Sequence, residues 1–174
     1  FTAIAVLHLQ DQGKLSVNDP LSKYFPDFPK GNSILLRHLL SHTSGIHNYT
    51  EDIGEEDSAI ICYPVDKQWI LDLIYKKPRD FKPGRQYSYN NSGFFLLGMI
   101  IEKVTGKSYE QVIRDLIFEP VGMHHSGFDF VHLPEPSKAR GYTRLNNREQ
   151  LPSKPWDSTV SYAAGSIYST TSDL

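Results

Sequence analysis

The segment 91–104 constrains the fold of this chain more than any other stretch, because it predicts a long apolar helix. Asn91 or Ser92 can open this helix as its cap, and Gly106 follows its last turn as the stop. The apolar run inside it, Phe94 to Ile101, is far too short to span a bilayer. A chain of 174 residues is long enough to pack such a helix into one domain with its own core.

Capping and stop signals predict further helices on both sides of this segment. From residue 127 onward the chain instead looks extended and irregular, so we expect a mostly α fold with a minor β part. The expected elements are a helix over 1–12 that stops at Gly13, a short helix from Asn18-Asp19-Pro20, a helix over 34–41 capped by Ser33 and followed by Gly45, a helix over 66–77 that stops at Pro78, a helix opened by the capping box Ser108 to Gln111, a strand over 142–145 with Asn146-Asn147 in its turn, and a helix start at 172–174.

Composition is that of an ordinary globular protein. Hydrophobic residues make up 39% of the chain and charged residues 22%, and the net charge is −2. The basic residues are scattered, so nothing indicates a nucleic acid or an anionic membrane as a partner. Cys62 is the single cysteine of the chain, which excludes an internal disulfide and leaves the cellular compartment open.

Tyr89-Asn90-Asn91 is the motif with the most chemical content. A tyrosine and an asparagine two residues apart, just before a helix, can direct a phenol and an amide into one cleft. A phenol near cationic side chains can accept and return a proton, and an amide can hold a substrate by hydrogen bonds. By itself the tripeptide equally fits a turn and a helix cap, and Asn91 suits both roles. Asn90 is expected to line the site at most.

Five segments place this motif in a wider context. They are FTAIAVLHLQDQGKLSVNDPLSKYFPDFP, ILLRHLLSHTSGI, FKPGRQYSYNNSGFFLLGMIIEKVTGKSYEQ, PVGMHHSGF and AAGSIYSTTSDL. In this order they resemble the serine β-lactamase / penicillin-binding-protein family, in particular its class C-like branch with esterases and D-amino-acid peptidases. The chain departs from the usual Tyr-Ser-Asn of that family only in its middle residue, Asn90.

The resemblance implies one incomplete catalytic domain over residues 1–174. Its fold is expected to be the helical subdomain of a β-lactamase/transpeptidase-like α/β fold, truncated at both ends. Of the three active-site boxes of the family, Ser-x-x-Lys is absent and should end about two residues before Phe1. The third box, Lys-Thr-Gly or His-x-Gly, is expected after Leu174. His125-Ser126-Gly127 matches its letters but lies too early in the chain, so we interpret it as a decoy.

The resemblance further implies a parent serine hydrolase that forms an acyl-enzyme with β-lactam, D-alanyl peptide or ester substrates. Tyr89 would transfer the proton, and Asn91 would bind the acyl-side amide of the substrate. No metal or organic cofactor is implied, and a periplasmic or extracellular location follows from the family alone. The chain by itself is expected to be inactive and to self-associate through the apolar face of its first helix. The alternative is a non-catalytic helical interaction module derived from such an enzyme.

Two other patterns suggest ligand sites and are rejected. His38 and His42 have the four-residue spacing of paired metal ligands, but no third ligand is marked, so structural roles are expected. Thr105-Gly106-Lys107-Ser108 imitates a phosphate-binding loop, but the glycine that such a loop needs is replaced by Ile101. Both tryptophans, Trp69 and Trp156, are expected in the core or the cleft wall, and Trp156, in the irregular part of the chain, is the better placed of the two to touch substrate.

Overall fold

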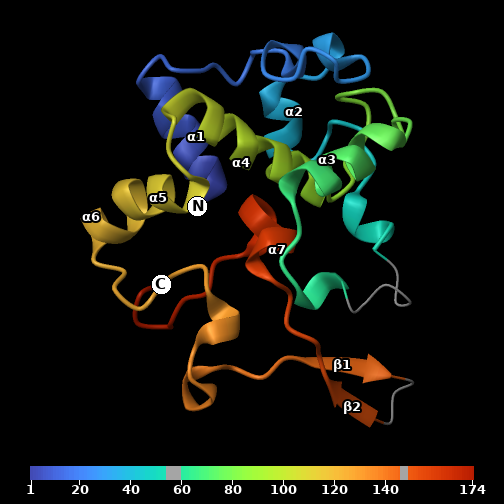
Figure 1. Cartoon of the computed structure of the whole chain (residues 1–174). Helices are drawn as coiled ribbons and strands as arrows, with labels where there is room; N and C mark the ends of the chain where they lie inside the picture. Colours follow the sequence, from blue (N-terminus) through green and yellow to red (C-terminus); the bar gives the residue numbers. More distant parts are fainter. Residues whose placement is uncertain (54–59, 146–148) are drawn as a thin grey trace.

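The computed structural model describes residues 1–53, 60–145 and 149–174. Helices form about half of the described chain, and one antiparallel hairpin lies at the lower end of Figure 1. The expectation of a mostly α chain with a minor β part is therefore confirmed. The α-helices and strands are α1 (Thr2–Asp11), α2 (Leu36–Leu40), α3 (Lys67–Lys76), α4 (Asn91–Thr105), α5 (Tyr109–Ile113), α6 (Glu119–Val121), α7 (Ser158–Gly165), β1 (Tyr142–Leu145) and β2 (Glu149–Pro152).

Helix α4 is the centre of the fold, and α1, α2, α5 and α7 all pack against it (Figure 1). Its side chains Phe95, Leu96, Leu97, Ile100 and Ile101 are completely buried. Burying a large apolar side chain contributes about 1.5–3 kcal/mol each, so this helix supplies much of the stability of the core. The helix ends as predicted, because Gly106 adopts the left-handed backbone conformation that closes the last turn.

Helix α7 crosses α4 at a glycine. A Cβ at Gly98 would collide with Ala163 and with the ring of Tyr162, so only glycine allows this close approach. The backbone of Tyr162 has φ of 40° and ψ of −130°, which breaks α7 and turns the ring against α4. Lys67 of α3 lies over the same ring, 4.3 Å from its centroid, so three helices meet at this tyrosine.

Glu102, one turn after Gly98 on α4, links three helices next to the same tyrosine. Its carboxylate accepts two hydrogen bonds, at 2.8 and 2.7 Å, from the amine of Lys67 in α3. The backbone N–H of Tyr109, at the start of α5, donates to the same carboxylate at 2.8 Å. Ser108 caps α5 by accepting from the N–H of Gln111 at 3.2 Å, which confirms the predicted cap.

Several predicted boundaries are wrong for local reasons. Ser33 does not cap α2, because its hydroxyl donates to the carbonyl of Lys30 and closes a separate 3₁₀ turn, Gly31–Ser33. The predicted short helix after Pro20 is only the 3₁₀ turn Leu21–Lys23. The predicted helix start at 172–174 is a turn, and α7 was not predicted at all. The strand over 142–145 is confirmed as β1, while its predicted turn at Asn146-Asn147 lies outside the described residues.

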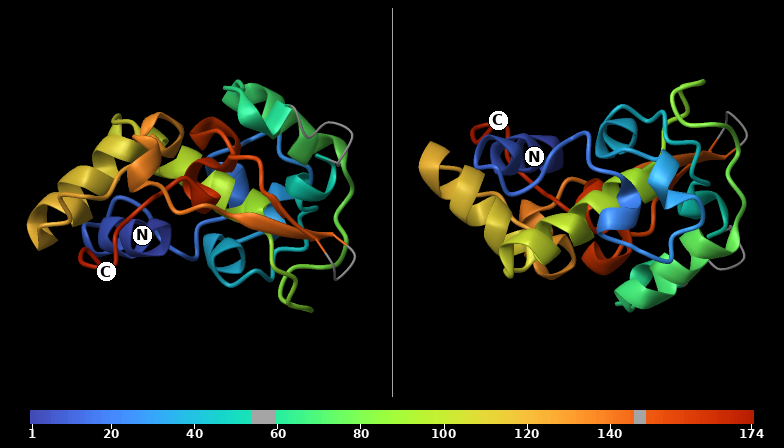
Figure 2. Two further views of the ribbon diagram at one scale, coloured as in Figure 1. Left: turned by 90° about the horizontal axis from the view of Figure 1, so that it is seen from below. Right: turned by 90° about the horizontal axis from the view of Figure 1, so that it is seen from above.

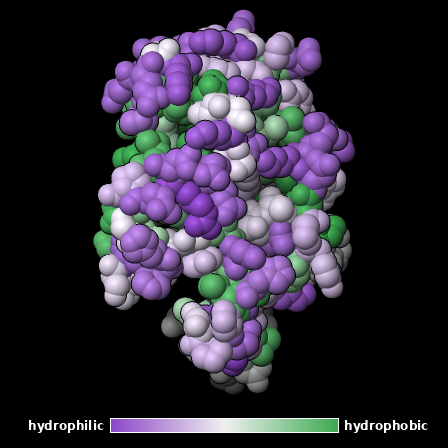
Figure 3. Space-filling view, turned by 60° about the vertical axis from the view of Figure 1, so that its left-hand side comes forward, coloured by the Kyte–Doolittle hydropathy of each residue, from purple (hydrophilic) through white to green (hydrophobic). Residues whose placement is uncertain are grey.

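The two chain ends lie on the same side of the molecule in all three ribbon views (Figures 1 and 2). Near the first residue, α1 exposes an apolar face formed by Phe1, Ile4 and Leu7, as expected. Self-association through this face stays a prediction. The face shown in Figure 3 is mostly hydrophilic, with small hydrophobic areas among the polar side chains. Within the described ranges, no helix is long and apolar enough to cross a membrane.

A Gly45→Ala change should destabilise the fold by about 2–4 kcal/mol, because two costs add at this position. Gly45 has φ of 72°, and a Cβ there would overlap the carbonyl oxygen of Phe81. Gly106→Ala is the matched control, since Gly106 has φ of 68° but no atom near the added Cβ. It should cost only the left-handed backbone penalty of about 1–2 kcal/mol. Urea unfolding measures both, and equal losses would contradict the steric account.

Candidate functional site

The loop that carries Tyr89 is held along a second loop by backbone hydrogen bonds. The N–H groups of Asp80, Gly84 and Ser88 donate to carbonyl groups of the segment 42–45, at 2.8, 2.8 and 2.9 Å. These bonds pair the two loops over most of the distance between α3 and α4. The position of Tyr89 is therefore set by backbone contacts along the loop that leads up to the motif.

Tyr89 is exposed and lies against a short stack of rings. Its side chain is 58% exposed, and its ring centroid lies 4.7 Å from that of His42. On the other side, the imidazole stacks on Phe94 of α4 with centroids 5.1 Å apart and planes 22° apart. The Nδ1 atom of His42 accepts the N–H of Asn90 at 3.1 Å, which requires an imidazole unprotonated at Nδ1. Burial lowers the pKa of His42 and so favours this neutral form.

Asn90 is the cap of α4, contrary to the expectation that it lines the site at most. Its side-chain oxygen accepts the N–H of Gly93 at 2.8 Å, and its amide nitrogen donates to the carbonyl of Ile46 at 2.5 Å. The residue is 5% exposed, so both bonds are shielded from water. Asn91 is the first helical residue and not the cap. The sequence could not separate the two, because adjacent asparagines suit the cap equally well.

Asn91 is thereby free for another task. Its side-chain nitrogen donates to the hydroxyl of Thr50 at 3.2 Å, and its backbone N–H donates to the side chain of Asn48 at 3.0 Å. No described residue donates to its side-chain oxygen, which leaves this oxygen as an acceptor for an incoming N–H group. Asn48 and Thr50 were missed as supports of Asn91, and only their place just after the HTSG segment hinted at them.

A cavity of about 430 Å³ opens beside the ring stack, between the starts of α1 and α4 and the end of α7. Phe94 lines it and connects it through His42 to Tyr89, which stands beside the cavity and not in its wall. Phe1 and Thr2 line the opposite side. The hydroxyl of Thr2 donates to the carbonyl of Ala163 at 2.7 Å, which fastens the start of α1 to α7.

The rejected metal pair has structural roles, as expected. His38 accepts the backbone N–H of Leu35 at 3.2 Å and supports the first turn of α2, while His42 supports Asn90. The backbone of His42 has φ of 55°, which ends that helix ahead of Gly45. Across the described ranges, no three histidine, cysteine or acidic side chains gather in a way that could hold a metal ion.

The segment His125-Ser126-Gly127, which only resembles the third box, is joined by hydrogen bonds to Asp173 near the end of the chain. The hydroxyl of Ser126 donates to Asp173 at 2.7 Å, and the backbone N–H of His125 donates to the same carboxylate at 2.8 Å. The hydrogen bond from Ser126 is the main reason that the pKa of Asp173 lies below its usual value. Ser126 and His125 both bind Asp173, and the described contacts include no hydrogen bond between the two side chains. The three residues therefore lack the serine-to-histidine hydrogen bond of a nucleophilic triad.

The two tryptophans occupy different surroundings. Trp69 is half-buried against the hydrophobic core, in agreement with the prediction of a core or wall position. Trp156 is 38% exposed and lines two hollows, one beside α7 and one beside the ends of the hairpin, and neither includes a residue of the ring stack of Tyr89. A contact between Trp156 and substrate stays a prediction.

Comparison with known proteins decides the family. The family model described as Beta-lactamase matches residues 1–174. The chain belongs to the Beta-lactamase family. PbpX of Bacillus subtilis (strain 168), which is named as a penicillin-binding protein, is 38% identical over 172 residues, covering 99% of this chain and 41% of that protein. The teichoic acid D-alanine hydrolase of Staphylococcus aureus (strain MRSA252) is 31% identical over 175 residues, covering 99% of this chain and 41% of that protein.

Solved structures agree with this assignment. A D-stereospecific amidohydrolase from Streptomyces sp. superposes with a TM-score of 0.86 at 29% identity, covering 99% of this chain and 55% of that one. The similarity confirms the predicted relation to β-lactamases and penicillin-binding proteins. The chain spans about two fifths of the length of these two curated relatives.

Proposed function

We propose that this chain supplies the Tyr-x-Asn side of the cleft in a serine hydrolase that works through an acyl-enzyme. The proposal rests on one observation, which is that the residues of the segment 89–91 have different roles. Asn90 takes the buried capping role, so that the exposed phenol of Tyr89 and the oxygen of Asn91 are left without partners among the described residues. Two polar groups left available within one tripeptide are what substrate handling requires.

The chemistry divides between these two side chains. A serine nucleophile attacks the substrate carbonyl, and its proton must move to the leaving group. The phenol oxygen of Tyr89 is proposed to carry this proton, and the oxygen of Asn91 to accept the N–H on the acyl side of the substrate. The cavity beside the ring stack supports this arrangement, because Phe94 lines it and connects it through His42 to Tyr89.

The proposed substrates are amides or esters of D-amino acids. Two of the similar proteins are a D-stereospecific amidohydrolase and a teichoic acid D-alanine hydrolase. The aromatic walls of the cavity, Phe94, Tyr109 and Tyr162, suit a small apolar side chain better than a charged one. β-Lactams react with the same kind of nucleophile and remain useful as covalent probes of it.

Substrate specificity tests this proposal. The intact gene product should release ammonia from D-phenylalanine amide and D-alanine from its esters, with kcat/KM about tenfold or more above the L forms. A chromogenic cephalosporin serves as the comparison for β-lactamase activity. If no substrate of this panel turns over, the alternative of a non-catalytic interaction module replaces the proposal, and a preference for the L forms would contradict the substrate class.

A further inference from the structure

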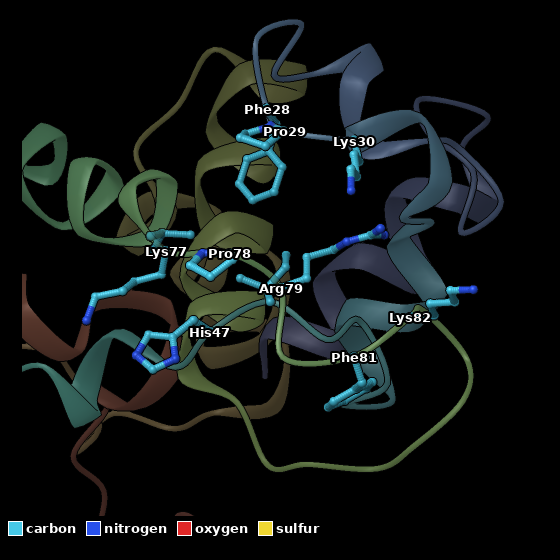
Figure 4. Close-up of a pocket in the computed structure, with 11 residues that line it drawn as sticks. Phe28, Pro29, Lys30, His47, Lys77, Pro78, Arg79, Phe81 and Lys82 are labelled. Atoms are coloured by element: carbon cyan, nitrogen blue, oxygen red, sulfur yellow. The ribbon is translucent and has the colours of Figure 1, made fainter.

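A second cavity shares no lining residue with the first and is surrounded by basic side chains. Its volume is about 420 Å³, and it is formed by the segments 28–30, 46–47 and 74–82 (Figure 4). Phe28, Ile74 and Phe81 supply apolar walls. Around them stand the basic side chains of the cavity, which are Lys30, His47, Lys77, Arg79 and Lys82.

The charges on one side of this cavity are balanced. Lys77 forms an ion pair with Asp52 at 2.7 Å. His47 lies between Asp52 and Asp80, with nitrogen–oxygen distances of 3.3 and 3.4 Å. Figure 4 shows Lys77 and His47 together on this side of the view. An anionic ligand gains little here, because two carboxylates already occupy the basic groups.

The charges on the other side are not balanced by any ion pair within the described ranges. Lys30, Arg79 and Lys82 form no ion pair with any described residue. The guanidinium of Arg79 donates to the hydroxyl of Ser33 at 2.9 Å, and that hydroxyl donates to the carbonyl of Lys30 at 2.8 Å. This relay holds the guanidinium close to the loop of Lys30, and Figure 4 shows both cationic groups on the same side of the cavity. Like charges held together in this way favour an anion between them.

We propose that this cavity binds a phosphate monoester that carries an apolar or aromatic group. A phosphate monoester at neutral pH has a charge of about −1.5 to −2. This charge suits three cations that form no ion pair with a described residue better than the single charge of a carboxylate ligand would. The planar guanidinium of Arg79 offers paired donors to phosphate oxygens, and Lys30 and Lys82 add flexible point charges. Phe28 and Phe81 form the surface for the organic part. The site is separate from Tyr89 and does not depend on the proposed function.

Calorimetric titration of the intact gene product with phenyl phosphate tests the site. Phenyl phosphate should bind more tightly than inorganic phosphate, because the apolar walls contribute, and phenol should not bind measurably. The double variant Lys30→Gln/Arg79→Gln should weaken phenyl phosphate binding by roughly 10–100-fold. Lys14→Gln/Lys76→Gln removes two charges from exposed lysines outside the cavity and should bind like the wild type.

Two further measurements keep the test decisive. Lys30→Gln alone removes a charge from a side chain with no described hydrogen bond, so it serves if the double variant fails to fold. Hydrolytic activity should be the same in all these variants, which separates this site from the cleft of Tyr89. Equal binding by both double variants, or equal affinity for phenyl phosphate and inorganic phosphate, would overturn the proposal.

Discussion

A Tyr89→Phe variant of the intact gene product should lose about 10²–10⁴-fold in kcat/KM, the usual contribution of a positioned acid–base group. Its free energy of unfolding should stay unchanged. The phenol is 58% exposed and its oxygen makes no hydrogen bond with the described part of the chain, so removing it leaves no buried group unpaired. The ring of phenylalanine keeps the contact with His42. Steady-state kinetics and urea unfolding of the same preparations measure both quantities.

Tyr87→Phe is the matched control for this variant. Tyr87 is 70% exposed and its ring also meets His42, edge-on at 6.0 Å. Its hydroxyl has no proposed role, so Tyr87→Phe should keep nearly full activity. Equal losses in the two variants would point to a general disturbance of the loop. Full activity of Tyr89→Phe together with a lower melting temperature would make Tyr89 a packing residue and contradict the site.

A large loss of stability is expected for Asn90→Ala, at about 2–4 kcal/mol. The change removes the cap of α4, which is worth about 1 kcal/mol. It also leaves the carbonyl of Ile46 without its buried donor, at a further cost of about 1–3 kcal/mol. Urea unfolding gives the free energy, and far-ultraviolet circular dichroism shows whether the helix content is kept.

Asn90→Ser separates the two contributions, and serine is the residue that the family often has at this place. A serine hydroxyl can still accept the N–H of Gly93, so this variant should be about 1 kcal/mol more stable than Asn90→Ala. The bond to Ile46 should still be lost. If the serine and alanine variants unfold at the same urea concentration, the capping bond carries no weight and the assignment of Asn90 as the cap is wrong.

The helices that the sequence predicted well are those with strong local signals at both ends. The helix over 66–77 is found as α3, because Asp66 caps it by accepting from Gln68 and Pro78 follows it. Helix α4 has the apolar run and Gly106. Helix α7 was missed, because the backbone of Tyr162 departs from helical geometry after a few residues and leaves too short an apolar pattern. What holds α7 in place is its contact with Gly98, which no local pattern reveals.

The candidate site likewise has a part that the sequence predicts and a part that depends on tertiary contacts. Tyr89 and Asn91 could be named from the motif and the family resemblance, and their roles stay predictions. The distribution of tasks within the motif could not be named, since it depends on the carbonyl of Ile46, more than forty residues earlier in the chain. The stack of Tyr89, His42 and Phe94 is likewise a tertiary arrangement, formed by two loops and a helix start. Local propensity contains no information on such contacts.

Formation of the acyl-enzyme is the measurement that tests the central claim most directly. The intact gene product would be mixed with a penicillin and its mass followed with time, for the wild type, Tyr89→Phe and Tyr87→Phe. We predict a single covalent adduct with the mass of the acyl group, formed at similar rates in the wild type and Tyr87→Phe and about 10²–10⁴-fold more slowly in Tyr89→Phe. The absence of any adduct in the wild type, or equal rates in all three proteins, would contradict the account.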